Sequence, residues 1–162
     1  MKLNEEIKRI KGLMLENSNP FTISTSGSVN IAPGIHISIN DGEVKMGHSN
    51  LINFDDANVY DYDFPRLLED VNEYCKSNCS ENFFNNNNSV YLHDLKVFEP
   101  YRGKGLSNRL MDECHNLGKD MGVDYITLIT DCTNSVAQNL YRKHGYEVYK
   151  SDGVKDLFYK QL

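Results

Sequence analysis

The sequence contains no long apolar segment. Its hydrophobic runs are only a few residues long, whereas a helix that crosses a bilayer needs about 20 apolar residues. Near the start, Leu3, Ile7, Ile10 and Met14 recur at helical spacing with charges between them, which predicts an amphipathic helix rather than a signal peptide. We therefore expect a cytoplasmic protein that makes no membrane contact.

Positive charge is also in short supply. Lysine and arginine number 17 against 23 aspartates and glutamates, for a net charge of -6. This balance argues against general affinity for the nucleic-acid backbone, so no nucleic-acid partner is expected. An acidic surface suits a cationic partner, although mild acidity is also ordinary in soluble proteins.

Cysteines are few and poorly placed for a metal. Of the four, only Cys75 and Cys79 have a suggestive spacing, and no second pair or nearby histidine cluster completes a zinc set. We predict free, mostly buried thiols, no disulfide and no metal site.

Two common phosphate-binding motifs are absent around the Gly-Lys-Gly turn at residues 103–105. A P-loop requires Ser or Thr after its lysine, but Gly105 follows Lys104. The dinucleotide fingerprint requires a third glycine where this chain has Asn108. Neither a nucleotide hydrolase nor a dehydrogenase fits.

What is present is the pattern of one mixed α/β domain, since 162 residues suit a single core. Alternating runs on either side of Asp41-Gly42 predict a hairpin, and residues 65–75 have a helical stripe. Residues 80–88 end in four asparagines and predict an exposed loop. The second half predicts a strand–helix–strand–helix order, and hence a partly parallel sheet. Its elements are expected at 89–97, 105–121, 123–130 and 134–144, followed by a terminal pair of strands.

The turn before the helix at 105–121 is suited to an anion. Gly103 and Gly105 let the backbone approach a ligand, and the first N–H groups of a helix have no intrahelical partner. Backbone N–H groups from Arg102 to Ser107 can therefore hold a pyrophosphate, with added charge from Arg102 and Lys104. A tight connection without a ligand is the alternative for this turn alone. The buried face of the following helix is predicted to comprise Leu106, Leu110, Met111, Cys114, Leu117 and Met121.

Two motifs in order resemble one family. Arg102-Gly-Lys-Gly105-Leu-Ser107 is similar to the acetyl-coenzyme A signature of the GCN5-related N-acetyltransferases (GNAT), Arg/Gln-x-x-Gly-x-Gly/Ala, with Ser107 in the last position. The segment from Asn134 to Tyr146 resembles the second motif of the family, Asn-x-x-Ala-x-x-Leu/Phe-Tyr-x-x-x-Gly-Phe/Tyr. In physical terms Asn134 can cap a helix and Gly145 can end it, and Val136, Ala137 and Leu140 are expected to pack inward.

This resemblance implies a GNAT-like mixed sheet, splayed between two adjacent strands and flanked by helices, that binds acetyl-CoA as co-substrate. It implies that Tyr141 is the general acid for the departing thiolate, whereas a core tyrosine is the structural alternative. The backbone of Leu95–Val97 would pair with the pantetheine arm. The implied coenzyme-binding residues are Leu95, Lys96, Val97, Arg102, Gly103, Lys104, Gly105, Leu106, Ser107, Asn134, Ala137 and Tyr141.

The strand at 89–97 supplies a candidate base. The segment resembles that of polyamine acetyltransferases, which have Glu where this chain has His93, so His93 is a candidate to accept the proton of an amine. Strand alternation puts His93 on the side of Tyr91 and Leu95, and Asp94, a candidate substrate-binding residue, on the other side unless a bulge intervenes. His36, His48, His115 and His144 have no motif and are interpreted as structural or solvent-facing.

The resemblance covers about residues 89–162, the acetyl-CoA-binding half, and leaves 1–88 as a divergent substrate-side half of one domain. There the acidic-aromatic cluster of Asp55, Asp56, Tyr60, Asp61, Tyr62 and Asp63 suits a cationic amine, or is simply a solvated loop. The function implied is N-acetyltransfer to an amine of a small molecule, peptide or protein, by direct attack in a ternary complex. A non-catalytic acyl-CoA-binding or regulatory module, a longer acyl chain and a homodimer all stay open.

Overall fold

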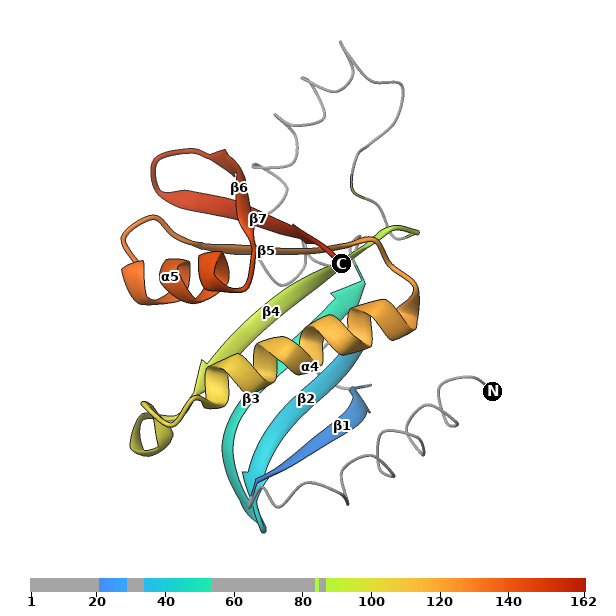
Figure 1. Ribbon diagram of the computed structural model, residues 1–162, viewed down its shortest axis with the longest axis vertical. Helices are drawn as coiled ribbons and strands as arrows, with labels where there is room; N and C mark the ends of the chain where they lie inside the picture. The colour runs from blue at the N-terminus through green and yellow to red at the C-terminus, as the bar shows by residue number, and fades with distance from the viewer. Residues whose placement is uncertain (1–20, 29–33, 54–83, 85–86) are drawn as a thin grey trace.

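The computed structural model describes residues 21–28, 34–53, 84 and 87–162. The predicted helices near residues 1–14 and 65–75, the acidic-aromatic cluster and Cys75 and Cys79 lie outside these ranges. Within them the chain forms one seven-stranded sheet in the order β1-β2-β3-β4-β5-β7-β6 (Figure 1). Its strands are β1 (Thr22–Ser28), β2 (Gly34–Asp41), β3 (Val44–Asn53), β4 (Ser89–Val97), β5 (Tyr125–Asp131), β6 (Glu147–Ser151) and β7 (Lys155–Gln161).

The predicted hairpin is confirmed as β2 and β3, which pair antiparallel from Gly34↔Ile52 to Asp41↔Val44. Gly42 closes the turn with a φ of 57°, a conformation that glycine adopts without steric cost. Alternation along β2 turns Ile37 and Ile39 into the core. The intervening polar residues therefore face the other side of the sheet.

The predicted strand at 89–97 is confirmed as β4, and its contacts with β5 are the only parallel ones between neighbouring strands of the sheet that the structure describes. The connection between β4 and β5 is the helix α4 (Leu106–Met121). A crossover helix is the usual link between parallel strands, because a tight turn cannot join their distant ends. The expected partly parallel sheet is therefore confirmed.

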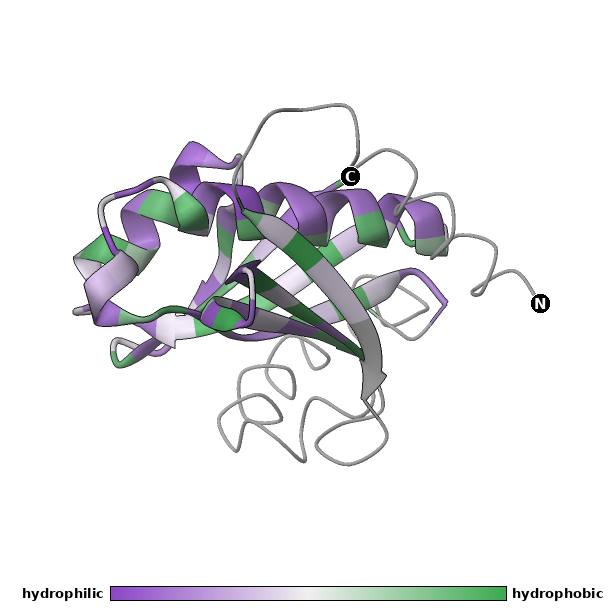
Figure 2. Cartoon of the chain, turned by 90° about the horizontal axis from the view of Figure 1, so that it is seen from below, coloured by the Kyte–Doolittle hydropathy of each residue, from purple (hydrophilic) through white to green (hydrophobic). Residues whose placement is uncertain are grey.

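Helix α4 lies across one face of the sheet, over β2, β3, β4 and β5 (Figure 2). Leu106, Leu110, Met111, Cys114 and Leu117 are buried, as their spacing predicts. The prediction that Met121 belongs to this face is wrong, because its side chain is 42% exposed. Met121 is the last helical residue before Gly122, whose φ of 73° ends the helix at the sheet margin.

Helix α5 (Ser135–Lys143) covers the same face beside β5 and β7. The predicted cap is confirmed, since the N–H of Ala137 donates to Oδ1 of Asn134 over 3.1 Å. Gly145 has a φ of 81° just beyond the helix, also as predicted. Val136 does not pack inward as expected. It lies in the first turn of α5 and is 81% exposed.

A smaller cluster lies on the opposite face of the sheet, around Ile52, Tyr91 and Leu157. Phe84 belongs to it and is buried, with its ring in edge contact with Tyr125 and Tyr149. The prediction of an exposed loop over 80–88 is therefore wrong at this position. Phe83 and Phe84 are a short apolar pair between polar residues, too short to show a periodic pattern, and tertiary contacts bury Phe84.

The core between α4 and the sheet is expected to contribute strongly to the free energy of unfolding. Leu110 is fully buried, so Leu110→Ala should lower the free energy of unfolding by about 2–5 kcal/mol through lost contacts and a residual cavity. Met121→Ala on the same helix should change it by less than about 0.5 kcal/mol, because the methionine is largely exposed. Urea titration followed by circular dichroism measures both. Equal losses would contradict this account of the core.

Gly105 is the N-cap of α4 and has a φ of 75°. A Cβ built on it meets no atom within 4 Å, so a substitution there is opposed by backbone conformation rather than by space. Gly105→Ala should therefore lower stability by about 1–2 kcal/mol. Gly105→Asn should cost less, because asparagine tolerates left-handed backbone. The order of the two variants in thermal unfolding checks the prediction.

Candidate active site

The site begins where β4 and β5 part. The two strands pair only at Ser89↔Tyr125, Val90↔Ile126 and Tyr91↔Thr127, and the Thr127 hydroxyl donates to the Val90 carbonyl over 3.3 Å. Beyond this segment β4 pairs only with β3, on its outer side. In the same way, β5 pairs only with β7. Figure 1 shows the two strands diverging from their shared end. The splayed sheet that the resemblance implied is thus present.

A cleft of about 510 Å³ occupies the space beyond the split. Strand β4, the turn before α4, the start of α4 and helix α5 form its walls. All of the predicted coenzyme-binding residues except Lys104 line it. The lining residues are Leu95, Lys96, Val97, Tyr101, Arg102, Gly103, Gly105, Leu106, Ser107, Asn134, Val136, Ala137, Leu140 and Tyr141.

The turn at the phosphate-binding end is held by its own backbone. Residues Glu99–Tyr101 form a short 3-10 helix, and the Arg102 N–H donates to the Glu99 carbonyl. The Arg102 side chain donates from Nε to the Val97 carbonyl over 3.1 Å, so it spans the turn. Gly103 and Gly105 both have positive φ, at 76° and 75°. Glycine is favoured at these two positions because other residues rarely adopt a positive φ.

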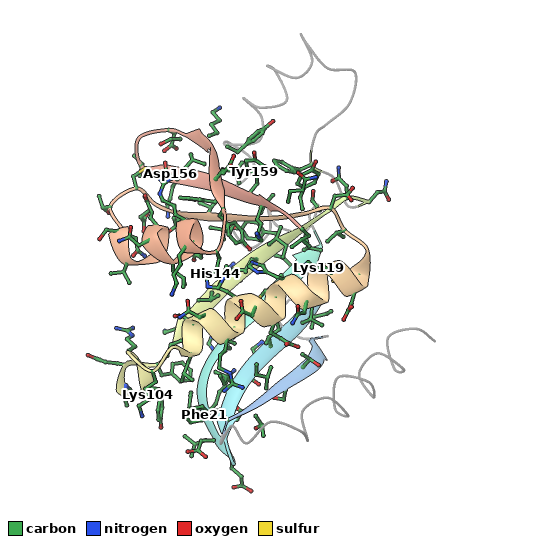
Figure 3. All side chains as sticks on the ribbon, in the orientation of Figure 1. Phe21, Lys104, Lys119, His144, Asp156 and Tyr159 are labelled. Atoms are coloured by element: carbon green, nitrogen blue, oxygen red, sulfur yellow. The ribbon has the colours of Figure 1, made fainter. Side chains whose placement is uncertain are left out.

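The first turn of α4 faces this end of the cleft. Gly105 has no side chain with which to cap the helix, and Leu106 and Ser107 line the cleft. Because the first N–H groups of a helix have no intrahelical partner and carry its positive dipole end, this wall can bind an anion. Lys104 lies apart from the cleft lining, with its Nζ 5.7 Å from the centroid of the Tyr101 ring (Figure 3).

Tyr141 lines the wall that α5 contributes. It is 8% exposed, and its ring lies 5.9 Å from the rings of both Tyr146 and Phe158. Burial, with a smaller effect of the nearby Cys114, raises the pKa of Tyr141 to about 12. The phenol therefore keeps its proton at any physiological pH. It can act as a proton donor at the cleft.

His93 and Asp94 lie at a bulge in β4. Between His48↔Lys96 and Asn50↔His93, two residues of β4 face one residue of β3, and Asp94 has a φ of 52°. The bulge moves Leu95 to the helix face, where it packs against the main core, while His93 stays beside Tyr91 on the opposite face. The predicted alternation, which put Leu95 on the same side as His93, is therefore wrong beyond Asp94. The bulge adds one residue and reverses the pattern.

The face of the sheet opposite α4 carries a group of polar side chains near the split, which we call the polar face: His36, His48, Asn50, His93 and Asp94. His48 Nε2 lies 2.8 Å from Asp94 Oδ2, and His36 Nδ1 lies 2.6 Å from Asn50 Oδ1. The Lys45 ammonium donates to His36 Nε2, so Nδ1 of that ring carries the proton shared with Asn50. His48 and His36 were predicted to be structural or exposed. The contact of His48 with Asp94 could be found only from strand pairing.

No helix among the described residues is long and apolar enough to cross a membrane.

The candidate substrate cluster around Tyr60 and Tyr62 lies outside the described residues. The structure therefore describes the coenzyme side of the predicted site, together with His93 and Asp94.

Comparison with known proteins points to one family. Residues 67–146 match the family model described as acetyltransferase (GNAT) family. The chain is 34% identical over 68 residues to the D-amino-acid N-acetyltransferase HPA3 of Saccharomyces cerevisiae, covering 40% of this chain and 42% of that protein. It is 28% identical over 58 residues to the uncharacterized N-acetyltransferase YycN of Bacillus subtilis, covering 36% of this chain and 37% of that protein. The matches thus span about two fifths of these relatives.

Solved structures share the fold. The PaiA N-acetyltransferase of Thermoplasma acidophilum, in complex with coenzyme A, has a TM-score of 0.54 at 17% identity, covering 78% of this chain and 60% of that one. A GNAT family acetyltransferase of Elizabethkingia anophelis with acetyl-CoA bound has a TM-score of 0.60 at 11% identity, covering 90% of this chain and 100% of that one. The family match thus identifies a GNAT acetyltransferase domain at residues 67–146 of this chain.

Proposed function

We propose that the protein is an N-acetyltransferase that transfers the acetyl group of acetyl-CoA to an amine in a ternary complex. The observation that carries the proposal is the cleft itself. It opens where β4 and β5 separate, and residues of both family motifs line it, Gly105 and Ser107 on one side and Ala137 and Tyr141 on the other. Elements from two separate parts of the chain thus bound one elongated site.

The residues present fit coenzyme A. A Cβ at Gly103 or Gly105 would project into open space, so the backbone there is accessible to phosphate groups. The edge of β4 from Leu95 to Val97 no longer pairs with β5, which leaves backbone groups for the amides of a pantetheine arm. Two relatives of the same fold are described with coenzyme A or acetyl-CoA bound.

In the proposed reaction the acceptor reaches the thioester from the polar face. The amine nitrogen forms a bond to the acetyl carbon, the carbon–sulfur bond breaks, and the electron pair goes to sulfur. Tyr141 gives its proton to the departing thiolate, and His93 accepts the proton that the amine loses. Asp94, with one oxygen bonded to His48 and its side chain half exposed, attracts the cationic acceptor.

A thiol-release assay tests the function. The full chain is incubated with acetyl-CoA and single amines, including spermidine, an aminoglycoside, peptide N-termini and both enantiomers of several amino acids, since the yeast relative is named for D-amino acids. Amine-dependent release of thiol, with the acetylated amine seen by mass spectrometry, supports the proposal. Coenzyme binding without release by any amine or thioester would make the protein the non-catalytic module.

Tyr141→Phe should lower turnover by about a hundredfold or more, because it removes the proton donor and leaves the ring. Binding of acetyl-CoA, measured by calorimetry, should change little. Because the pKa of Tyr141 is raised to about 12, its acid form persists as pH rises and is lost only near pH 12. Tyr159→Phe, which removes a hydroxyl bonded to Glu147 away from the cleft, is the control. Unchanged turnover in Tyr141→Phe would remove this residue from the mechanism.

His93→Gln should lower turnover by about a hundredfold, because glutamine keeps polarity but accepts no proton. His36→Gln is the matched control, since His36 shares the polar face but lies on β2, two strands from β4. Equal effects of the two variants would instead indicate a structural role for the polar face.

A further inference from the structure

Three side chains with metal-binding atoms meet where α4 passes the end of α5. Asp112 and His115 belong to α4, and His144 is the C-cap of α5. One ligand atom from each lies within 4.8 Å of the others. Figure 3 shows His144 beside α4. This junction is separate from the residues that line the coenzyme cleft.

Local structure explains why these residues converge. Asp112 and His115 are three positions apart on a helix, so both project from the same side of α4. His144 follows the last turn of α5, and Gly145, with a φ of 81°, turns the chain back toward β6. Tertiary packing of α4 against α5 then brings the third side chain to the other two.

The arrangement of His144 leaves space for a cation. Its Nε2 lies 3.0 Å from Oδ1 of Asn108, an oxygen that can only accept, so Nε2 carries the proton. In the neutral ring Nδ1 is then an unprotonated acceptor. It lies 3.6 Å from Asp112 Oδ1, also an acceptor and too far for a hydrogen bond. Two lone-pair atoms that face each other are stabilised by a positive charge between them.

His115 completes the group from the buried side. It is 9% exposed, and its Nε2 lies 3.2 Å from the hydroxyl of Tyr146. Burial first, and then the charges of Lys160, His144 and Lys119, lower the pKa of His115 to about 4. Burial also lowers the pKa of His144. His115 thus supplies a ligand atom from the buried side, within 4.8 Å of those of Asp112 and His144.

We propose that Asp112, His115 and His144 bind one divalent transition-metal ion, such as Zn²⁺ or Co²⁺, with water as the fourth ligand. Bond lengths of about 2.0–2.2 Å place tetrahedral ligand atoms roughly 3.4 Å apart. The Asp112–His144 separation of 3.6 Å is close to this value, and the other separations are within 4.8 Å. Two imidazoles and one carboxylate form a ligand set that zinc accepts and magnesium does not favour. Such a site would differ from the sequence-based expectation of no metal.

A bound ion would connect two helices that line the coenzyme cleft. The ion ties α4, whose first turn faces the phosphate-binding end of the cleft, to the end of α5, the helix that carries Tyr141. His115 contacts Tyr146, whose ring is next to that of Tyr141. The ion would thus restrain two walls of the coenzyme cleft relative to each other.

Co²⁺ binding to the full chain, stripped with EDTA and desalted, tests the proposal. Visible absorption distinguishes nitrogen and oxygen ligands from thiolates, and a Cys75→Ser/Cys79→Ser background prevents those thiols from binding the probe. We expect one Co²⁺ per chain and a higher unfolding temperature with the ion. His144→Ala and Asp112→Asn should each weaken binding by about tenfold or more.

Asp120→Asn removes the same charge from α4 outside the group and should leave the affinity within about twofold. Lys160→Gln should tighten binding, because the lysine charge opposes the ion. His144 is the C-cap of α5 and less buried than His115, which lies inside α4, so His144→Ala should fold where a His115 variant fails. The proposal is overturned if the chain takes up no saturable Co²⁺, if binding survives both His144→Ala and Asp112→Asn, or if it disappears in the double-serine background.

Discussion

The short pairing between β4 and β5 is the constraint on which the rest of the structure depends. Hydrogen bonds join the two parallel strands at only three residue pairs, from Ser89 to Tyr91. Had the pairing continued, the edge of β4 from Leu95 onward would be occupied and no cleft would form. Instead each strand is held on its outer side by an antiparallel neighbour, β3 or β7. The sheet can therefore stay open in the middle without losing its integrity.

Two helices maintain that opening from one side. Leu110, Met111 and Cys114 of α4 pack under β2–β4, while Tyr141 of α5 packs against Phe158 of β7. Both helices also contribute residues to the walls of the cleft. The first turn of α4 offers unpaired N–H groups to an anion, and α5 brings a protonated phenol to the same cleft. Tyr141 thus belongs both to the core and to the wall of the cleft.

The bulge at Asp94 has a comparable role on the other face. A left-handed φ of 52° in a non-glycine residue is costly, and the 2.8 Å contact between Asp94 and His48 supports it. The extra residue turns Leu95 toward the core on the helix side and leaves His93 on the polar face. A single irregularity therefore separates the apolar wall of the cleft from the candidate acceptor side.

Periodicity and turn chemistry in the sequence were sufficient for the elements of the second half, because each has its own local signals. The strand at 89–97, the Gly-Lys-Gly turn, the cap at Asn134 and the end at Gly145 need no distant residue to be recognised. The same local patterns failed for Met121 and Val136, whose exposure depends on where each helix lies relative to the sheet. They failed also for Phe84, which only distant aromatic rings bury.

The sequence by itself indicated the family of the domain, the order of the elements in the second half and the two motifs that line the cleft, since these depend on residue type and spacing. Only the tertiary structure decided where β4 and β5 separate, which way His93 and Asp94 face, and that His48 reaches Asp94. The tertiary structure also brings Asp112 and His115 close to His144. His144 lies 29 residues after His115 in the sequence. Strand register and helix packing are set by the sum of many distant contacts, and no local pattern encodes that sum.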